Sequence, residues 1–476
     1  MGAVTETSGP RLNLLIRGGT LVGEQGVWAA DLGVRDGRIA AILAPGERVA
    51  AAEVLDAAGL HLLPGLVDQH VHFNEPGRTH WEGFETGSRA AAAGGVTTVI
   101  EMPLNSHPPT TTAEALELKQ TTVAGKAVVD YAFWGGLVDD NVAALPALHA
   151  GGVVGVKAFM SHAGTDDYPY ATDHVLFEGL KTVARLGTVL DLHAENDSLT
   201  RGYAEQLRAA GRIDRRAYAE SRPPVAELEA IERGILLARQ ADPNARIHFV
   251  HVSIGDGARA VERARRDGQP VSLETCPHYL TLDEDRFAEI GPDAKCAPPI
   301  RPRDVVEDLW ACVLEGLVDS FASDHSPCPP EDKSRGDQDI WLAWGGVSGV
   351  QTMLPLLLDE GVHNRGLPLP RLVRMASANP ARIVGLWPRK GHLGLGADAD
   401  IALVDLARTW TLEPNLLQTR HPVSPFIGYR FRGAVIQTLV RGVTVFRDGE
   451  IVAPPAHGQF LRPLPGPRAP PVVGHG

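Results

Sequence analysis

The chain reads Gly65-Leu-Val-Asp-Gln-His-Val-His72 at the point where its hydrophobic pattern changes. Before this point, residues 13–64 form short apolar runs separated by glycines, which is typical of antiparallel β structure. After it, short apolar runs alternate with segments rich in alanine, leucine, glutamate and arginine. A buried parallel strand reads as a continuous apolar run, so each run followed by a helical segment predicts one β-α unit.

Apolar runs of this kind follow one another along the middle of the chain. There are eight: 65–72, 96–102, 128–138, 153–160, 188–194, 246–252, 271–279 and 318–323. Eight β-α units predict an α/β fold in which the strands close into a TIM-like (β/α)8 barrel.

The short-strand pattern returns near residue 391, for example from Ile401 to Val404. We therefore expect residues 13–64 and 391–453 to pair into one small β-sandwich, with the barrel of residues 65–390 inserted between them. Residues 454–476 are dense in proline and glycine and predict an irregular C-terminal arm.

Bulk composition excludes several classes of protein. The chain has 476 residues, of which 44% are hydrophobic and 22% charged, and its net charge is −13. These values are ordinary for a globular enzyme and disfavour a nucleic-acid partner, which usually requires a basic patch. No signal peptide and no run of about 18 apolar residues is recognisable, so we expect a cytoplasmic protein without a membrane partner. Four cysteines without close C-x-x-C spacing are expected to be reduced (Cys276, Cys296, Cys312 and Cys328).

Two histidines end the first predicted barrel strand. His70 and His72 are two residues apart and therefore point to the same side of a strand. At the carboxyl end of a barrel strand, that side faces the catalytic mouth. The H-x-H pattern alone is weak, because two histidines also occur at this spacing by chance.

A lysine lies inside the fourth apolar run. Lys157 in Val153-Val-Gly-Val-Lys-Ala-Phe159 is costly to bury unless it is paired or modified. Burial lowers the pKa of a lysine, and the neutral amine can take up carbon dioxide to form a carbamate. The alternative is a structural lysine whose amine extends to water.

The remaining strand ends add further ligand-type side chains. The fifth run offers His193, and the eighth offers Asp324, which can bind a metal and accept a proton from water. The sixth offers His248 and His251, which are three apart and so face opposite sides of a strand. We choose His251, because it lies nearer the strand end, and expect His248 to point outward or to be packed.

Together these residues predict a metal centre at the barrel mouth. Imidazole and carboxylate ligands suit zinc, manganese, iron or cobalt, and zinc is our default. The absence of cysteine among the candidates disfavours a closed structural site.

The segment 65–72, followed by Asn74-Glu-Pro-Gly-Arg78, resembles the cyclic amidohydrolase branch of the amidohydrolase superfamily. This branch includes allantoinases, dihydroorotases and hydantoinases, and the resemblance covers the barrel and both sandwich segments. It implies two divalent metal ions per subunit, a carboxylated Lys157 formed with carbon dioxide as the bridge, and a homotetramer. The metal ligands that it implies are His70, His72, Lys157, His193, His251 and Asp324.

Several segments discriminate within this branch. Dihydroorotases that resemble this chain have an arginine where Asn74 stands, and an amide cannot replace that bidentate carboxylate clamp. We discount Arg78 as a substitute, because Pro76-Gly77 predicts a turn. The segments 74–84, 102–106, 274–279, 295–301 and 344–349 resemble allantoinases.

The resemblance also suggests substrate contacts. Some hydantoinases have a carbonyl-polarising tyrosine at the position of His162, and His278 is an equally plausible polar group near the mouth or a hydrogen-bond partner of another site residue. The residues expected to contact substrate are Asn74, His162, Cys296 and Gly346.

The predicted reaction is hydrolysis of the hydantoin-ring amide of allantoin to allantoate, a step of purine degradation. We expect a metal-bridging hydroxide to attack the ring carbonyl, while Asp324 takes its proton and delivers it to the leaving nitrogen. The alternatives are a hydantoinase or dihydropyrimidinase and a non-catalytic scaffolding relative. The second is disfavoured, because no expected ligand is missing.

Overall fold

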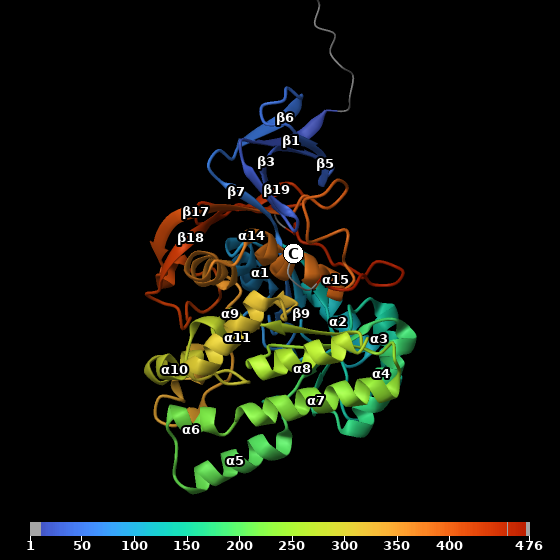
Figure 1. Cartoon of the computed structure of the whole chain (residues 1–476), viewed down its shortest axis with the longest axis vertical. Helices are drawn as coiled ribbons and strands as arrows, with labels where there is room; N and C mark the ends of the chain where they lie inside the picture. The colour runs from blue at the N-terminus through green and yellow to red at the C-terminus, as the bar shows by residue number, and fades with distance from the viewer. Residues whose placement is uncertain (1–10, 455, 473–476) are drawn as a thin grey trace, which may run out of the picture.

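A computed structural model of the chain describes residues 11–454 and 456–472 (Figure 1). Eight parallel strand positions form its centre, in the order in which the sequence predicts them. The strands are β8 (Leu66–Val71), β9 (Val96–Glu101), β10 (Asp130–Phe133) continued by β11 (Gly135–Gly136), β12 (Val156–Phe159), β13 (Val189–His193), β14 (Arg246–Phe249), β15 (Val271–Thr275) and β16 (Ser320–Phe321).

Hydrogen bonds close these strands into a ring. Each strand pairs in parallel with its neighbours from β8 to β10 and from β11 to β16. The ring closes between the first and eighth positions, where His72 N donates to His325 O at 2.7 Å and Val71 forms a parallel bridge with His325. The predicted TIM-like barrel is therefore confirmed.

Helices surround the barrel and connect its strands (Figure 1). The connecting helices are α1 (Phe84–Ala93), α2 (Ala113–Val123), α3 (Leu145–Gly151), α4 (Asp173–Leu186), α7 (Pro224–Ala241), α8 (Gly255–Arg266) and α11 (Arg303–Glu315). After β16 the chain forms α13 (Met353–Leu356), η4 (Leu357–Asn364), α14 (Leu369–Val373), η5 (Arg374–Ala378) and α15 (Asn379–Ile383).

Further helices extend the loops that follow the carboxyl ends of the strands. These are α5 (Asp197–Ala209), α6 (Arg215–Glu220), α9 (Pro277–Thr281), α10 (Glu284–Ile290), α12 (Pro330–Ser334) and the short 3-10 turns η1 (Val142–Ala144), η2 (Pro292–Ala294) and η3 (Ile340–Leu342). In Figure 1, α5 and α6 lie at the end of the molecule opposite the N-terminal strands.

The two ends of the chain form two mixed sheets, each with one parallel pairing among antiparallel ones. One sheet has the order β5-β4-β1-β6, formed by β5 (Arg38–Leu43), β4 (Asp31–Arg35), β1 (Leu12–Arg17) and β6 (Ala51–Asp56). The other has the order β20-β19-β18-β17-β7-β2-β3, formed by β20 (Glu450–Ile451), β19 (Val443–Arg447), β18 (Arg430–Val440), β17 (Ile401–Thr411), β7 (His61–Pro64), β2 (Thr20–Gly23) and β3 (Gly26–Ala29).

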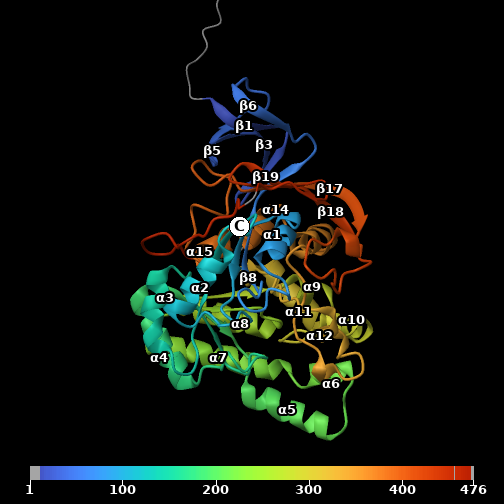
Figure 2. The same ribbon diagram turned by 180° about the vertical axis from the view of Figure 1, so that it is seen from behind.

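Pairing of β7 with β17 joins segments that are more than 300 residues apart. The short turn η6 (Pro414–Leu416) lies between β17 and β18. Figure 2 shows these strands at one end of the molecule, away from α5 and α6. The domain boundaries at residues 64/65 and 390/391 remain a prediction.

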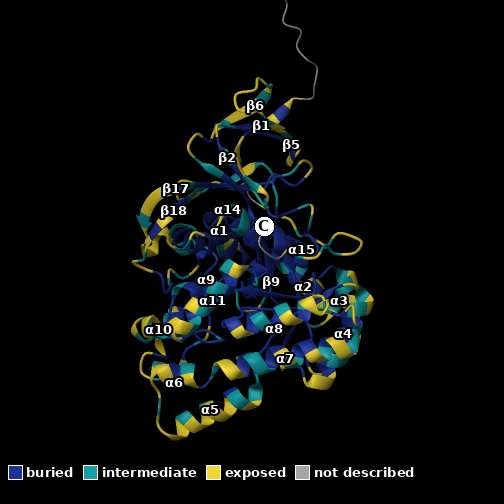
Figure 3. Ribbon diagram, in the orientation of Figure 1, coloured by how far each residue is buried: buried dark blue, intermediate teal, exposed yellow. Residues whose placement is uncertain are grey.

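Burial follows the barrel (Figure 3). Every residue of β8, β9 and β13 is buried, as expected for strands covered on both faces. Residues 456–472, the described part of the C-terminal arm, contain no helix but are packed: Leu461 N donates to Tyr131 O at 2.7 Å, and Phe460 stacks on Phe133 with ring centroids 5.2 Å apart. Among the described residues, no helix combines the length and hydrophobicity that a bilayer crossing requires.

Candidate metal centre

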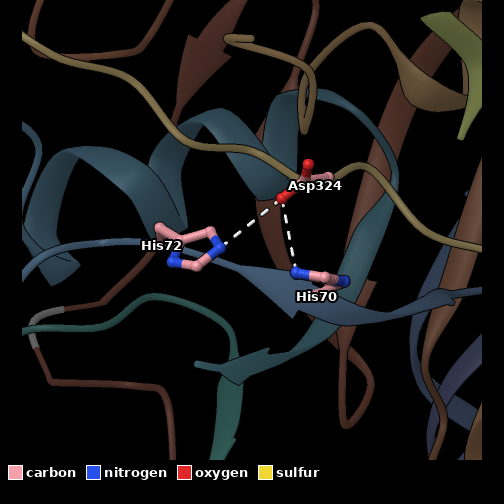
Figure 4. A group of neighbouring side chains, drawn as sticks. All are labelled: His70, His72 and Asp324. Carbon is pink, nitrogen blue, oxygen red and sulfur yellow. Dashed lines mark ion pairs between the residues drawn. The ribbon is translucent and has the colours of Figure 1, made fainter. Parts of the chain in front are cut away.

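Three predicted ligands meet where the first and eighth strands end (Figure 4). His70 Nε2 lies 3.3 Å and His72 Nε2 3.5 Å from Asp324 Oδ1. All three side chains are almost fully buried. Burial raises the pKa of Asp324, but the imidazoles of His70, His72 and His278 outweigh this effect and hold it below its usual value. The three side chains are spaced closely enough to hold a metal ion.

Two further imidazoles complete one continuous cluster. His193 Nδ1 lies 3.0 Å from His251 Nε2, and the ring centroid of His251 lies 5.4 Å from that of His70. His193 ends β13, whereas His251 lies two residues beyond the end of β14 with a left-handed φ of 40°. The facing nitrogens of His193 and His251 are thus contributed by the end of β13 and by the segment that follows β14.

Lys157 lies in the same part of the barrel interior. Its side chain is fully buried on β12, with Nζ 3.7 Å from Asp191 Oδ2 and no hydrogen-bond partner among the described residues. Burial lowers its pKa, although the charge of Asp191 opposes the shift. An unpartnered buried amine fits a group that is chemically modified or bound to a ligand better than a structural lysine that reaches water.

Three of the histidines have their outer ring nitrogen held by another side chain. His70 Nδ1 lies 2.6 Å from Glu274 Oε1, His193 Nε2 lies 2.8 Å from Glu195 Oε2, and His72 Nδ1 lies 3.2 Å from the Asn105 amide. Such partners fix the tautomer and leave the other nitrogen free for a metal. His70 and His72 would therefore bind through Nε2 and His193 through Nδ1. Arg222 Nε, at 3.0 Å, in turn holds Glu195.

The structure decides between the two alternatives expected for His248 on the sixth strand. His248 does not point outward: it is buried with Nδ1 2.8 Å from Ser272 Oγ and Nε2 2.9 Å from Gln69 Nε2. It is therefore the packed histidine of the two expected alternatives. The alternation rule failed because His251 lies outside the regular strand, in a left-handed conformation that turns its side chain toward the mouth.

A cavity of about 660 Å³ opens above the cluster. Its lining includes five of the six candidate ligands (His70, His72, His193, His251 and Asp324). Of the residues expected to contact substrate, His162, Cys296 and Gly346 also line it. Gly346 has no room for a larger side chain, because a Cβ atom would lie 2.2 Å from Ser326 O. His162 is exposed, and its Nδ1 accepts a hydrogen bond from Gly164 N.

Asn74, the fourth residue expected to contact substrate, does not lie in the lining of this cavity. It is fully buried, and its Nδ2 is directed toward Pro327 O at 3.4 Å. The amides of Phe73 and Asn74 donate to Glu101 at 2.6 and 3.1 Å, which holds this loop against the end of β9. The backbone of Asn74 has a left-handed φ of 65°.

His278 lies beside the cluster but outside the cavity lining. Its side chain is buried and its Nε2 has no hydrogen-bond partner among the residues described here. Burial lowers its pKa to about 4, with the charge of Asp324 opposing.

Glu274, Glu195 and Asn105 were missed by the sequence analysis. Glu195 follows His193 by two residues and thus shares its strand face, a signal that was readable. Glu274 is a carboxylate inside an apolar run, which by itself indicates a partner. For Asn105 we find no comparable signal, because its contact with His72 depends on a loop conformation.

A barrel whose mouth gathers imidazoles, a carboxylate and a buried lysine defines a metal-dependent hydrolase of the barrel type. The model of the amidohydrolase family matches residues 61–445. The chain belongs to the amidohydrolase family.

Relatives and solved structures agree with this assignment. The chain is 51% identical to the allantoinase of Rubrobacter xylanophilus over 95% of this chain and 98% of the relative. It is 45% identical to the allantoinase of Deinococcus radiodurans over 95% of this chain and 99% of that protein. It also resembles the structure of an L-hydantoinase (dihydropyrimidinase) from Arthrobacter aurescens, with a TM-score of 0.92 and 37% identity over 95% of this chain and all of that one.

Proposed function

We propose that this protein is a hydrolase that opens the hydantoin ring of allantoin at an amide C–N bond, giving allantoate. The observation that carries the proposal is the convergence of His70, His72, His193, His251, Lys157 and Asp324 at one barrel mouth. The nearly full-length similarity to proteins named allantoinase supports the choice of substrate.

The ligand set fits two divalent metal ions, with zinc as our default. Neutral Lys157 would take up carbon dioxide, forming an N–C bond and releasing a proton, so that two carbamate oxygens become available as a bridge. The unpartnered Lys157 Nζ and the outward nitrogens held by Glu274, Asn105 and Glu195 support this arrangement. When bound, the ions would lower the pKa of water and polarise the ring carbonyl.

Asp324 is the group that we expect to move the proton. Its Oδ1 faces the imidazoles of His70 and His72, which leaves Oδ2 to accept a proton from the attacking water (Figure 4). The carboxyl group would then donate that proton to the ring nitrogen as the C–N bond breaks, so that the carboxylate is regenerated. His162, Cys296 and Gly346, which line the cavity, are proposed to contact the substrate.

A hydantoinase or dihydropyrimidinase activity is the second candidate. The similarity to the Arthrobacter aurescens enzyme favours it, since that chain is matched over its whole length. We further propose a homotetramer in the cytoplasm, in line with the resemblance to the cyclic amidohydrolases.

Substrate comparison tests these proposals. The protein is freed of metal, reconstituted with Zn²⁺ and bicarbonate, and assayed with allantoin, hydantoin and dihydrouracil at equal enzyme concentration. We expect the highest kcat/KM for allantoin. A higher value for hydantoin or dihydrouracil would replace the first candidate by the second, and no turnover of any of the three would contradict both.

A further inference from the structure

The side chain of Asn105 lies against the outer edge of the His72 imidazole. Its amide Nδ2 is 3.2 Å from His72 Nδ1, on the side of the ring opposite to the Nε2 that faces Asp324. Asn105 is 3% exposed, so bulk water cannot replace this contact. The amide therefore determines what His72 Nδ1 can donate to or accept from.

The two ends of the Asn105 amide differ in what they leave unsatisfied. With Nδ2 toward the ring, Oδ1 is buried and has no hydrogen-bond partner among the described residues. Exchanging the two amide ends by a half-turn brings Oδ1 to His72 Nδ1, where it accepts a hydrogen bond from Nδ1–H. Either orientation leaves one end of the amide without a partner, but only the second accepts from His72 Nδ1–H, the tautomer that leaves Nε2 free for a metal ion, so metal binding by His72 favours the second orientation.

The backbone of Asn105 is held in place from the far side. Arg78 Nη1 donates to Asn105 O at 3.0 Å, and Arg78 Nη2 is 3.2 Å from Asp167 Oδ2. Asp167 also lies 3.2 Å from His107 Nδ1. Asn105 itself has a left-handed φ of 67°, a conformation that asparagine, aspartate and glycine adopt most readily. The amide is thus presented to His72 by a fixed loop.

We infer that Asn105 is a positioning residue of the metal centre: its Oδ1 accepts a hydrogen bond from His72 Nδ1–H and so keeps His72 Nε2 as the ligand nitrogen. The inference rests on the proposed function, because it presupposes that His72 binds a metal. It assigns to Arg78 and Asp167 the task of holding this amide in place.

The test measures zinc binding by two variants that both tolerate the backbone conformation. Asn105→Gly removes the acceptor, and Asn105→Asp keeps an acceptor and abolishes the donor. Zn²⁺ is titrated against a competing chromogenic chelator, and the free Zn²⁺ at half-occupancy is recorded. Loss of a hydrogen-bond partner of a metal-bound histidine weakens metal affinity by about 10–100-fold. We expect that loss for Asn105→Gly and parent-like or tighter binding for Asn105→Asp.

Matched substitutions at Asn141 serve as the control. Its amide donates to Thr111 O and Gly136 O and its Oδ1 accepts from Val138 N, so Asn141→Gly and Asn141→Asp lose comparable hydrogen bonds without touching a ligand. Both should bind Zn²⁺ as the parent does.

The outcomes separate the role of Asn105 from the proposed metal centre. Unchanged Zn²⁺ affinity in Asn105→Gly would assign Asn105 to substrate contact alone and overturn the inference. Weak binding by Asn105→Asp would mean that the amide acts as a donor, which also overturns it; this result decides the matter if Asn105→Gly does not fold. Failure of the unaltered protein to bind Zn²⁺ would instead contradict the proposed metal centre.

Discussion

Oε1 of Glu274 lies 2.6 Å from Nδ1 of His70, although the two residues are 204 positions apart in the chain. The other oxygen of the same carboxylate accepts a hydrogen bond from Gln69 Nε2 at 2.6 Å. Since Gln69 and His70 are adjacent on β8, one buried carboxylate on β15 fixes the end of the first barrel strand. The imidazole is thereby oriented before any ion arrives.

We predict that Glu274→Gln weakens Zn²⁺ binding by about 10–100-fold. A glutamine can accept from His70 Nδ1–H only by directing its NH₂ group at Gln69 Nε2, which is itself a donor. Equilibrium titration with a competing chelator measures the effect. Glu229→Gln, on the outer helix α7, is the control, and equal Zn²⁺ affinity of the Glu274 variant and the parent would exclude the orienting role.

We predict that Lys157→Ala loses both bound metal and turnover, because the bridging oxygens disappear with the amine. Short carboxylic acids such as acetate should restore part of each, since they supply two oxygens to the vacated space. Metal content by elemental analysis and the rate of ring opening are the measurements. Lys181→Ala, at a partly exposed ion pair with Glu178, is the control. Retention of two metals and normal turnover by the Lys157 variant would exclude the bridge.

The sequence predicted the barrel because each of its strands is an apolar run, a pattern that depends only on local composition. It also pointed to the residues that the strands themselves carry to the mouth, such as His70 and Lys157. It counted Asn74 among the substrate contacts, although this side chain does not line the cavity, it overlooked Asn105, and for His248 it could not decide between an outward and a packed position. Asn74, Asn105 and His251 have left-handed backbone conformations, and strand alternation cannot predict where such residues direct their side chains.

Asp324→Asn is predicted to lower kcat by at least about 10²–10⁴-fold, the usual contribution of a general acid–base group. An amide keeps the size of the side chain but cannot take up and return the proton. Steady-state kinetics on samples of equal metal content separates this loss from loss of metal. If kcat falls less than tenfold, Asp324 is a ligand and the proton is carried by another group.

Lys390 connects the barrel to the terminal sheets and supports a prediction about stability and pH. Its Nζ lies 2.6 Å from Asp130, 3.0 Å from Asp398 and 2.7 Å from Asp400, all buried. Burial alone would lower its pKa, but these carboxylates, Asp400 foremost, raise it above its usual value. Because folding raises the pKa of this lysine, its ionised form contributes to the free energy of unfolding. The contribution is fully present below the unfolded-state pKa, about 10.4, and is lost only as pH rises through the folded-state pKa.

Lys390→Met should therefore lower the free energy of unfolding by about 3–5 kcal/mol at neutral pH, because it leaves buried carboxylates without their cation. Burial raises the pKa of Asp400 and the Lys390 charge opposes that rise, so without the ammonium the variant's carboxylate takes up a proton at a higher pH than the parent's, and the variant regains stability as pH falls. The difference between parent and variant should shrink from pH 8 to pH 5 in urea denaturation. A pH-independent difference would contradict this explanation, and Lys181→Met should change stability little.

The last prediction concerns rejection of dihydroorotate, whose carboxylate would need a cationic partner in the mouth. Arg78 does not line the cavity, and its guanidinium already binds Asn105 O and Asp167. The cations that do line it are engaged elsewhere. Arg222 is held by Glu195, Arg201 lies 3.5 Å from Asp197, Lys295 donates to Ile340 O and Ala343 O, and Arg208 lies over the Trp341 ring. A carboxylate buried there without a partner costs several kcal/mol, so we expect kcat/KM for allantoin to exceed that for dihydroorotate by roughly a factor of thousands.

Asp167→Ala removes one partner of Arg78, and we expect no gain in dihydroorotate turnover, because the hydrogen bond to Asn105 O still directs the guanidinium away from the cavity. A gain in that variant would make Arg78 a latent clamp, whereas comparable values for the two substrates in the parent would contradict the proposed substrate.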